Sequence, residues 1–492
     1  MAFLTEAANR GSISTGYDID NSCKFESDNS EYLSKTPSSA GNRKTWTLSC
    51  WVKRTELTAN SNSTGNQNMV FSAGDTYLQF DGNAIWINHR AASENFFLAT
   101  NRLFVDPYAW YHIVWKVDTT QGTASNRAKL YINGIQETSF QSSTYTNMSL
   151  NYDTLINSTN EHEVGKYSNE ETTYAGFFNG YIAEMHLVDG TALDPTDFGE
   201  FDSDSNIWKP KAYAGSYGTN GFYLDFKDAS NMGNDANGGT DFAETNITAA
   251  NQATDSPTNN FPILVPMYAY AGTSGTLSEG GLEWDINMPS NSAFNPNTSA
   301  MSSFQMSGTN GGKWYMESKI TSNNRAFVGI VSSLAFLQQT TDPTEFVYWD
   351  FYNGWIGSSL ISTETNPPDA AVNTIIGMAI DCDNQRVTFS KNGGWLQANG
   401  DMNGSTPSDW RWDWTSDANF LDHPNCNGNV AFWCGIADDN NVWRPIHQVN
   451  FGGFSPYTIS SGNADENGYG NFEYAVPSGF YALCTKNLAE YG

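Results

Sequence analysis

Two aromatic clusters in the second half of the chain carry residue types that can bind sugars. The run Asp409-Trp410-Arg411-Trp412-Asp413-Trp414 places tryptophans at alternate positions, so they share one face if the segment is extended. A second cluster occupies residues 348–355. Exposed rings of this kind could stack on pyranose rings, although tryptophan is more often buried in a core. The candidate ligand-binding residues are therefore Trp349, Tyr352, Trp355, Trp410, Trp412 and Trp414.

The elements that must position these rings are short strands. Alternation of apolar and polar residues predicts half-buried strands at 46–53, 111–117 and 313–320, and apolar runs predict strands at 325–331 and 375–380. Asn133-Gly134 and Asn392-Gly393 each follow a strand-like segment, which is the strongest short signal for a hairpin. Many strands without helical stretches between them favour sandwiches over parallel α/β folds.

Composition limits the classes of partner. The 492 residues are too many for one core, so at least two domains are expected. The formal net charge of −29 disfavours nucleic acid and anionic lipid as partners. The sequence has neither an apolar run of about 18 residues nor a signal-peptide pattern. We therefore expect that the protein does not insert into a membrane. We also expect it to be made in a host cytoplasm and to carry six free cysteines.

Motifs in both halves carry a family resemblance. TWTLSCWVKR (45–54), WYHIVWKVD (110–118), KLYING (129–134) and FFNGYIAEMHLVDGTAL (177–193) resemble the laminin G-like branch of the concanavalin A-like lectin/glucanase superfamily. GGKWYMESKI (311–320), IIGMAIDCDNQRVTFSKNGGW (375–395) and VNFGGF (449–454) resemble SPRY domains. The resemblance implies an all-β chain of two tandem antiparallel β-sandwiches of the jelly-roll type, joined by a polar linker.

The expected domain boundaries follow from these matches and from composition. Residues 1–17 are an N-terminal segment that could attach to a virion, and 18–229 form the laminin G-like sandwich. Residues 230–276 are poor in apolar side chains and predict a linker or strap, and 277–492 form the SPRY-like sandwich.

The resemblance also bears on metals and catalysis. Laminin G-like domains often hold a cation at the sandwich rim, which implies a calcium site near Asp75, Asp81, Asp118 or Asp153, although no cofactor is required. The β-glucanases of the superfamily carry Glu-x-Asp-x-x-Glu on one strand. The nearest match begins at Glu283, but Met288 replaces the second glutamate and cannot act as a general acid. We therefore expect no enzymatic activity.

The order of segments is similar to that in virion and tail-fibre-like proteins of marine tailed bacteriophages. The opening run 16–46, SYGTNGFYLDFKDASN (216–231) and TDSPTNNF (254–261) carry that similarity. It implies a virion location on tail or capsid, other virion proteins as partners, a homotrimer by family analogy, and attachment to host surface glycans. An architectural protein without a ligand and a glycan-degrading enzyme are the alternatives.

Overall fold

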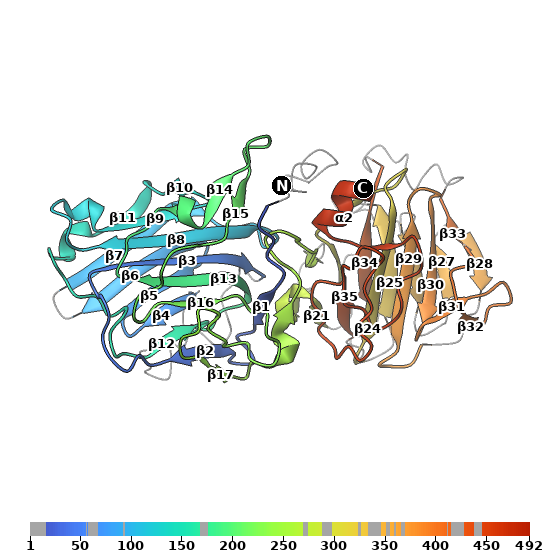
Figure 1. The fold of residues 1–492 in the computed structure, drawn as a ribbon. Coiled ribbons are helices and arrows are strands. Elements are labelled where there is room, and N and C mark those ends of the chain that lie inside the picture. Colours follow the sequence, from blue (N-terminus) through green and yellow to red (C-terminus); the bar gives the residue numbers. More distant parts are fainter. Residues whose placement is uncertain are drawn as a thin grey trace. The chain divides into compact units, whose positions relative to one another are not determined.

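A computed structural model describes most of the chain as two compact units. The described residues are 16–55, 57, 67–91, 94–167, 176–268, 274–287, 298–322, 326–332, 346–350, 355–358, 361–365, 370–410, 412–414, 428–436 and 445–492. The N-terminal unit is Ser14–Asn259 and the C-terminal unit contains Asn260–Gly492. Each unit consists of layered β-sheets (Figure 1), and all named strand pairs are antiparallel except β24 with β36.

The first sheet of the N-terminal unit, sheet A, has the order β10-β9-β8-β3-β13-β1-β18, with β16 also paired to β13. Its strands are β1 Ser22–Phe25, β3 Thr45–Arg54, β8 Trp110–Asp118, β9 Ala128–Ile132, β10 Ile135–Gln136, β13 Gly180–Asp189, β16 Phe222–Leu224 and β18 Gln252–Ala253. Asn133 and Gly134 between β9 and β10 have φ of 48° and 78°. The predicted Asn-Gly hairpin is therefore confirmed, because both turn residues are left-handed.

The second sheet, sheet B, has the order β11-β7-β6-β5-β4-β12-β2-β17. Its strands are β2 Tyr32–Lys35, β4 Gln67–Ala73, β5 Thr76–Asp81, β6 Ala84–Ala91, β7 Glu94–Leu103, β11 Phe140–Ser143, β12 His162–Val164 and β17 Ala243–Thr245. A separate hairpin pairs β14 Gly199–Phe201 with β15 Trp208–Pro210. The short helices of this unit are η1 Ala124–Asn126, η2 Tyr145–Asn147, η3 Pro195–Asp197 and η4 Ala249–Asn251.

The core of the N-terminal unit contains the residues that alternation predicts. Trp46, Leu48, Cys50, Ile113 and Trp115 are all buried in one cluster. However, the other face of β3 is also buried, and the expectation of a half-exposed strand is wrong. A second cluster on Val114, Val188, Phe198 and Tyr217 shows the reason, because the chain after β13 folds back over sheet A.

The C-terminal unit is a second sandwich of two sheets. One sheet has the order β19-β22-β34-β25-β26-β27-β28, with β23 on β34. Its strands are β19 Leu264–Tyr268, β22 Thr298–Ser302, β23 Met306–Ser307, β25 Ala326–Ser332, β26 Phe346–Asp350, β27 Trp355–Ser358, β28 Ile361–Thr365 and β34 Asn429–Ile436. Val328 is buried there, as predicted.

The other sheet has the order β20-β21-β35-β24-β29-β30-β31-β32, with β33 on β30 and β36 on β24. Trp314, Ile380 and Phe389 are buried as predicted. The strands are β20 Ser274–Ser278, β21 Glu283–Asn287, β24 Lys313–Ile320, β29 Ile375–Asp381, β30 Arg386–Lys391, β31 Gly394–Leu396, β32 Met402–Gly404, β33 Trp412–Asp413, β35 Ile446–Asn450 and β36 Tyr481–Ala482. Among the described residues of this unit, the helices are η5 Glu279–Gly281 and α2 Thr485–Tyr491. Among the described residues, no helix is long and apolar enough to span a bilayer.

The prediction of a linker at 230–276 is wrong, because both ends of this segment form strands within the two units. Its first part belongs to the N-terminal unit, where β17 pairs with β2 and β18 pairs with β1. Its last part belongs to the C-terminal unit, where β19 pairs with β22 and β20 pairs with β21. The boundary between the units falls between Asn259 and Asn260.

Candidate ligand-binding face of the N-terminal unit

Two of the tryptophans that were predicted to bind sugar are buried in the core. Trp349 has an exposed fraction of 0% and packs edge-on against Phe389. Trp414 has an exposed fraction of 1%, and its Nε1 donates a hydrogen bond to the carbonyl of Gly308. Both rings are core residues and cannot stack on a ligand, so these two predictions are corrected.

Trp410 is half-buried and already has partners from its own unit. The guanidinium of Arg386 lies 4.1 Å from its ring centroid, and the Phe480 ring stacks at 6.0 Å with an interplanar angle of 15°. The Asp381 carboxylate fixes Arg386 by accepting a 3.0 Å hydrogen bond from its Nε. Tyr352 and the side chains of Trp355 and Trp412 lie outside the described residues.

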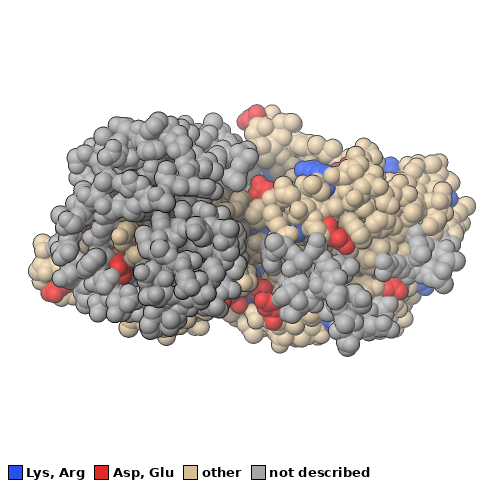
Figure 2. Space-filling model, turned by 180° about the vertical axis from the view of Figure 1, so that it is seen from behind, with Lys and Arg blue, Asp and Glu red and all other residues tan. Residues whose placement is uncertain are grey.

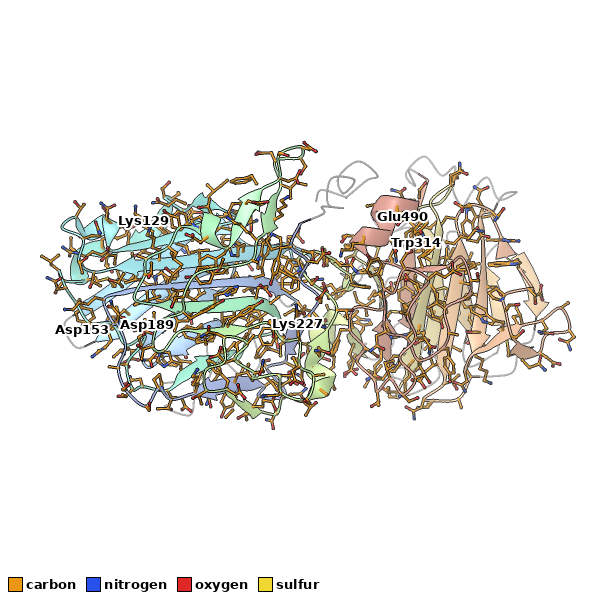
Figure 3. All side chains as sticks on the ribbon, in the orientation of Figure 1. Lys129, Asp153, Asp189, Lys227, Trp314 and Glu490 are labelled. Carbon is orange, nitrogen blue, oxygen red and sulfur yellow. The ribbon has the colours of Figure 1, made fainter. Side chains whose placement is uncertain are left out.

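The four aspartates proposed for calcium do not form a common site in the described part of the chain. Asp118 accepts hydrogen bonds from Thr120 and Gln121 on its own loop. Asp75 accepts one from the Tyr167 hydroxyl. Asp153 is exposed at the end of the unit (Figure 3), where its carbonyl accepts from Arg43. No group of three or more acidic, histidine or cysteine side chains is placed to hold a metal among the described residues.

A different set of polar and aromatic side chains gathers on the outer face of sheet B. Leu78 and Phe80 on β5 and Ile85 and Ile87 on β6 enter the core. Side chains alternate along a strand, so their neighbours point outward. The register places Gln79 opposite Trp86 and Tyr77 opposite Asn88. We call the four outward residues Tyr77, Gln79, Trp86 and Asn88 the β5–β6 face.

Three polar atoms of the β5–β6 face have no hydrogen-bond partner although they are buried. They are Nε2 of Gln79, Nε1 of Trp86 and Oδ1 of Asn88. Gln79 and Asn88 have exposed fractions of only 1% and 5%. An unsatisfied buried donor or acceptor costs about 1–3 kcal/mol, and such groups are rare in native proteins. Three of them on neighbouring positions of one face therefore need an explanation.

The surroundings of these atoms are aromatic. Phe97 on β7 packs edge-on against Trp86 with ring centroids 4.9 Å apart, and both rings are half-buried. Tyr167 packs edge-on against Tyr77 at 5.3 Å. Nδ2 of Asn88 donates a 2.8 Å hydrogen bond to the Tyr77 hydroxyl, which holds the amide and leaves its oxygen without a donor.

Charged groups border this face. Lys166 pairs with Glu163 at 3.3 Å, and its ammonium lies 4.3 Å from the Tyr32 ring centroid. Asp75 and Asp81 lie at the two ends of β5, and burial raises the pKa of Asp81 above its usual value. On the side of the molecule drawn in Figure 2, acidic and basic side chains form separate small patches among other residues.

A second buried polar cluster, on the outer face of sheet A, is satisfied internally. The Glu184 carboxylate accepts hydrogen bonds from the hydroxyls of Tyr17 at 2.9 Å and Tyr223 at 2.7 Å. The His186 ring stacks on Tyr223 at 4.4 Å, and its Nδ1 is 2.8 Å from the Tyr217 hydroxyl. Glu184 has a φ of 47° at a bulge in β13. These contacts fix the segment after β13, which folds back over sheet A, to β13 itself. We therefore assign the cluster a structural role.

Sequence reasoning missed the β5–β6 face although a signal was present. The segments TYLQFD (76–81) and AIWINH (84–89) alternate strictly, and their outward positions hold an aromatic ring or an amide. An outward face that holds aromatic rings and amides together suits a ligand. The tryptophan-rich runs of the second half drew attention instead, although tryptophan content alone does not distinguish a platform from a core.

Comparison with known proteins supports the class of the N-terminal unit. Residues 27–197 match the family model of the concanavalin A-like lectin/glucanases superfamily, in its laminin G type. This part of the chain is therefore similar to concanavalin A-like, laminin G-like domains, and the described part of the chain is nearly all-β. No curated protein sequence matches the chain.

Several solved structures are similar at low sequence identity. A proposed carbohydrate-binding protein from Bacteroides ovatus is 14% identical over 46% of this chain, with a TM-score of 0.32. The match spans 59% of that protein. The SPRY domain of human HERC1 is 12% identical over 36% of this chain and 93% of its own length, with a TM-score of 0.25. Domains LG4-5 of mouse laminin alpha1 are 7% identical over 96% of this chain and 89% of their own length, with a TM-score of 0.28.

Proposed function

We propose that the chain is a non-enzymatic adhesin that binds glycans through the β5–β6 face of its N-terminal unit. The observation that carries this proposal is the pair of half-buried rings Trp86 and Phe97, which pack edge-on with centroids 4.9 Å apart on this face of the sheet. Sugars present apolar ring faces, which pack on accessible aromatic side chains. The matched family includes lectins in its name, which agrees with this chemistry.

Binding without catalysis fits the chemistry of the face. Its unpartnered groups are two amides and an indole, and none of these exchanges a proton near neutral pH. Glycoside hydrolysis would need a pair of carboxyl groups flanking the bond to be cleaved. Glu283, in the nearest sequence match to that motif, accepts hydrogen bonds from Ser278 and Gln448 on neighbouring strands, which indicates a structural role.

The location that we propose for this adhesin is the surface of a bacteriophage particle. The similarity of the runs at 16–46, 216–231 and 254–261 to phage structural proteins supports it. Display in many copies would compensate for weak binding at each site, because avidity can add about 10²–10⁴-fold. A homotrimer is the oligomer that the same similarity implies.

The test compares two tryptophans in the two units. Trp86→Ala should weaken binding of the full chain to immobilised host-surface polysaccharide at least tenfold, because it removes the half-buried ring on which a sugar would pack. Trp410→Ala, the same change at a half-buried ring that has partners in its own unit, should bind normally. Equal affinity of wild type and Trp86→Ala, with both proteins folded, would refute the proposed site.

An architectural role is the second candidate, and one apolar patch favours it. Ile135, at the start of β10, has an exposed fraction of 63%. Phe201 and Ile207, at the β14–β15 hairpin, have exposed fractions of 42% and 45%. The two hairpins adjoin, because a Cβ on Gly134 would lie 2.3 Å from the Trp208 ring. Loss of particle assembly, with normal polysaccharide binding, in Ile135→Ser combined with Phe201→Ser would support this role.

A further inference from the structure

We propose that β14 is an edge to which an extended segment of a partner protein adds as a further strand, and that apolar and basic side chains alternate in this segment. The edge lies on the β14–β15 hairpin beside sheet A, whereas the β5–β6 face belongs to sheet B. The inference is therefore independent of glycan binding. It rests on the architectural role given above as the second candidate function, and it specifies the chemistry of the partner.

One tryptophan fixes the β14–β15 hairpin to the sandwich. Trp208 on β15 is buried, and its Nε1 donates a 3.0 Å hydrogen bond to Nδ1 of His112 on β8. The two rings also stack, with centroids 5.8 Å apart. The hairpin projects from the N-terminal unit in Figure 1, but its contact with sheet A is rigid. A rigid edge loses little conformational entropy when a partner binds.

The backbone of β14 has an open edge. Among the described strands, β14 pairs only with β15. The N–H of Asp202 donates to the carbonyl of Ile207 at 2.8 Å. Because bonded and non-bonded pairs alternate in an antiparallel ladder, the preceding pair of Phe201 and Trp208 is non-bonded. The N–H and C=O of Phe201 therefore point away from β15, where no described residue bonds to them. Open edges of this kind accept an additional strand.

The side chains beside this edge are apolar on one face of the hairpin and acidic on the other. Phe201 is exposed although its ring packs edge-on against Trp208. Ile135 is also exposed, and it directly follows Gly134, which adjoins the Trp208 ring. Glu200 precedes Phe201 on β14 and therefore points to the opposite face. An added strand thus places apolar side chains beside Phe201 and polar side chains beside Glu200.

The charge of the hairpin requires these polar side chains to be basic. Residues 199–210 contain three acidic residues and one basic residue, a net charge of −2. The Lys209 ammonium is shared between Glu200 at 3.5 Å and Asp202 at 3.2 Å. Opposite charges on adjacent strands attract, whereas like charges destabilise the pairing. A second copy of the chain carries the same acidic hairpin and a net charge of −29, which makes it a poorer occupant.

The experiment uses three fluorescein-labelled synthetic peptides with blocked ends. The probe has the sequence SKVKVKS, and the controls SEVEVES and SKSKSKS change only the charge or only the apolar residues. Fluorescence anisotropy measures their binding to the full chain at physiological salt. The probe should bind at least about tenfold more tightly than either control. Hydrogen exchange at the Phe201 amide, followed by mass spectrometry, should slow when the probe is bound.

Two pairs of variants separate the backbone contribution from the charge contribution. Phe201→Ala and Phe201→Pro both remove the ring, but only proline removes the N–H, which β15 does not use. Phe201→Pro should therefore bind the probe at least about threefold more weakly than Phe201→Ala does. Glu200→Gln should weaken binding and reduce its dependence on salt. Glu161→Gln, at an exposed glutamate outside the hairpin, should bind as the wild type does.

Three results would overturn the inference. The first is equal binding of the glutamate peptide, and the second is equal binding of the probe by Phe201→Ala and Phe201→Pro. The third is self-association of the full chain that Phe201→Ala abolishes in sedimentation, because the edge would then belong to a second copy. Failure of the probe to bind also rejects strand addition. If the combined change of Ile135 and Phe201 to serine still blocks particle assembly in that case, the architectural role stands through another contact.

Discussion

Lys53 Nζ lies 2.6 Å from Asp255 Oδ2, and both side chains are buried, with exposed fractions of 0% and 3%. Trp110 Nε1 donates a 3.1 Å hydrogen bond to the other oxygen of the same carboxylate. Asp255 follows β18, whereas Lys53 is on β3 in the middle of sheet A. This ion pair therefore fixes the end of the N-terminal unit to its central strand.

Removing one partner of this pair should strongly destabilise the N-terminal unit. Asp255→Ala leaves a buried ammonium without its carboxylate, and such changes cost about 3–5 kcal/mol. Denaturant unfolding followed by circular dichroism measures the loss. Asp20→Ala is the control, because Asp20 is 65% exposed in its pair with Lys227, so that the cost should stay below about 1 kcal/mol. Similar stability of the two variants would contradict the assigned role of Asp255.

The same ion pair explains why the linker prediction was wrong. Residues 230–259 have almost no apolar periodicity, and they join the sandwich through the short edge strands β17 and β18 and through Asp255. Backbone pairing and one buried carboxylate leave no periodic pattern in a sequence. In contrast, Trp46, Leu48 and Cys50 alternate on a ten-residue strand, and their burial was predictable.

Buried histidines should make the N-terminal unit less stable in mild acid. Burial lowers the pKa of His112 to about 3 and that of His162 to about 4. Between these values and pH 6.5 the unfolded chain binds more protons than the folded one, so stability falls as pH falls. The slope is about 1.4 kcal/mol per pH unit for each histidine, which gives up to about 2 kcal/mol each from pH 6.5 to 5.

Denaturant unfolding at pH 6.5, 5.5 and 5.0 measures this slope. His162→Gln should reduce it, since one of the two titrating groups is gone. The C-terminal unit is a poorer test, because burial lowers the pKa of His447 to about 4 but raises that of Glu317. These two shifts oppose each other above pH 4.5, because acidification protonates the unfolded histidine and the folded glutamate. Stability of the N-terminal unit that rises on acidification would contradict the prediction.

Trp349→Ala should damage folding without acting on ligand binding. The ring is fully buried against Phe389, and deletion of a buried tryptophan costs about 3–5 kcal/mol. Its effect should appear as a lower unfolding midpoint of the C-terminal unit in calorimetry. Polysaccharide binding below that midpoint should match the wild type, since the ring cannot reach a ligand. Weaker binding by a fully folded Trp349→Ala protein would restore the tryptophan cluster as a site.

The cysteines should be free and unreactive in the folded protein. Cys23, Cys50, Cys382, Cys434 and Cys484 are buried free thiols, and burial raises the pKa of Cys50, Cys382 and Cys434 well above the usual range. A disulfide-exchange reagent should therefore react slowly with these five until denaturant is added, because the thiolate is the reactive form. Denatured, unreduced protein should then show six thiols, including Cys426, which lies outside the described residues. A count of four would reveal a disulfide.

The last prediction separates a binding face from an accident of packing. If Gln79 Nε2 is unpartnered because a ligand completes it, then the free protein is less stable than it could be. Replacing an unsatisfied buried polar group with an apolar one removes a penalty of about 1–3 kcal/mol. Gln79→Leu should therefore raise the free energy of unfolding by about 1 kcal/mol while weakening polysaccharide binding.

Gln252→Leu is the matched control, because Nε2 of Gln252 donates to the carbonyls of Phe226 and Lys227 at 2.8 and 3.0 Å. That variant loses satisfied hydrogen bonds and should be destabilised by about 1 kcal/mol, with binding unchanged. If Gln79→Leu destabilises the protein as Gln252→Leu does, then the unpartnered amide of Gln79 does not lower the stability of the free protein. A role for this amide in ligand binding would then be contradicted.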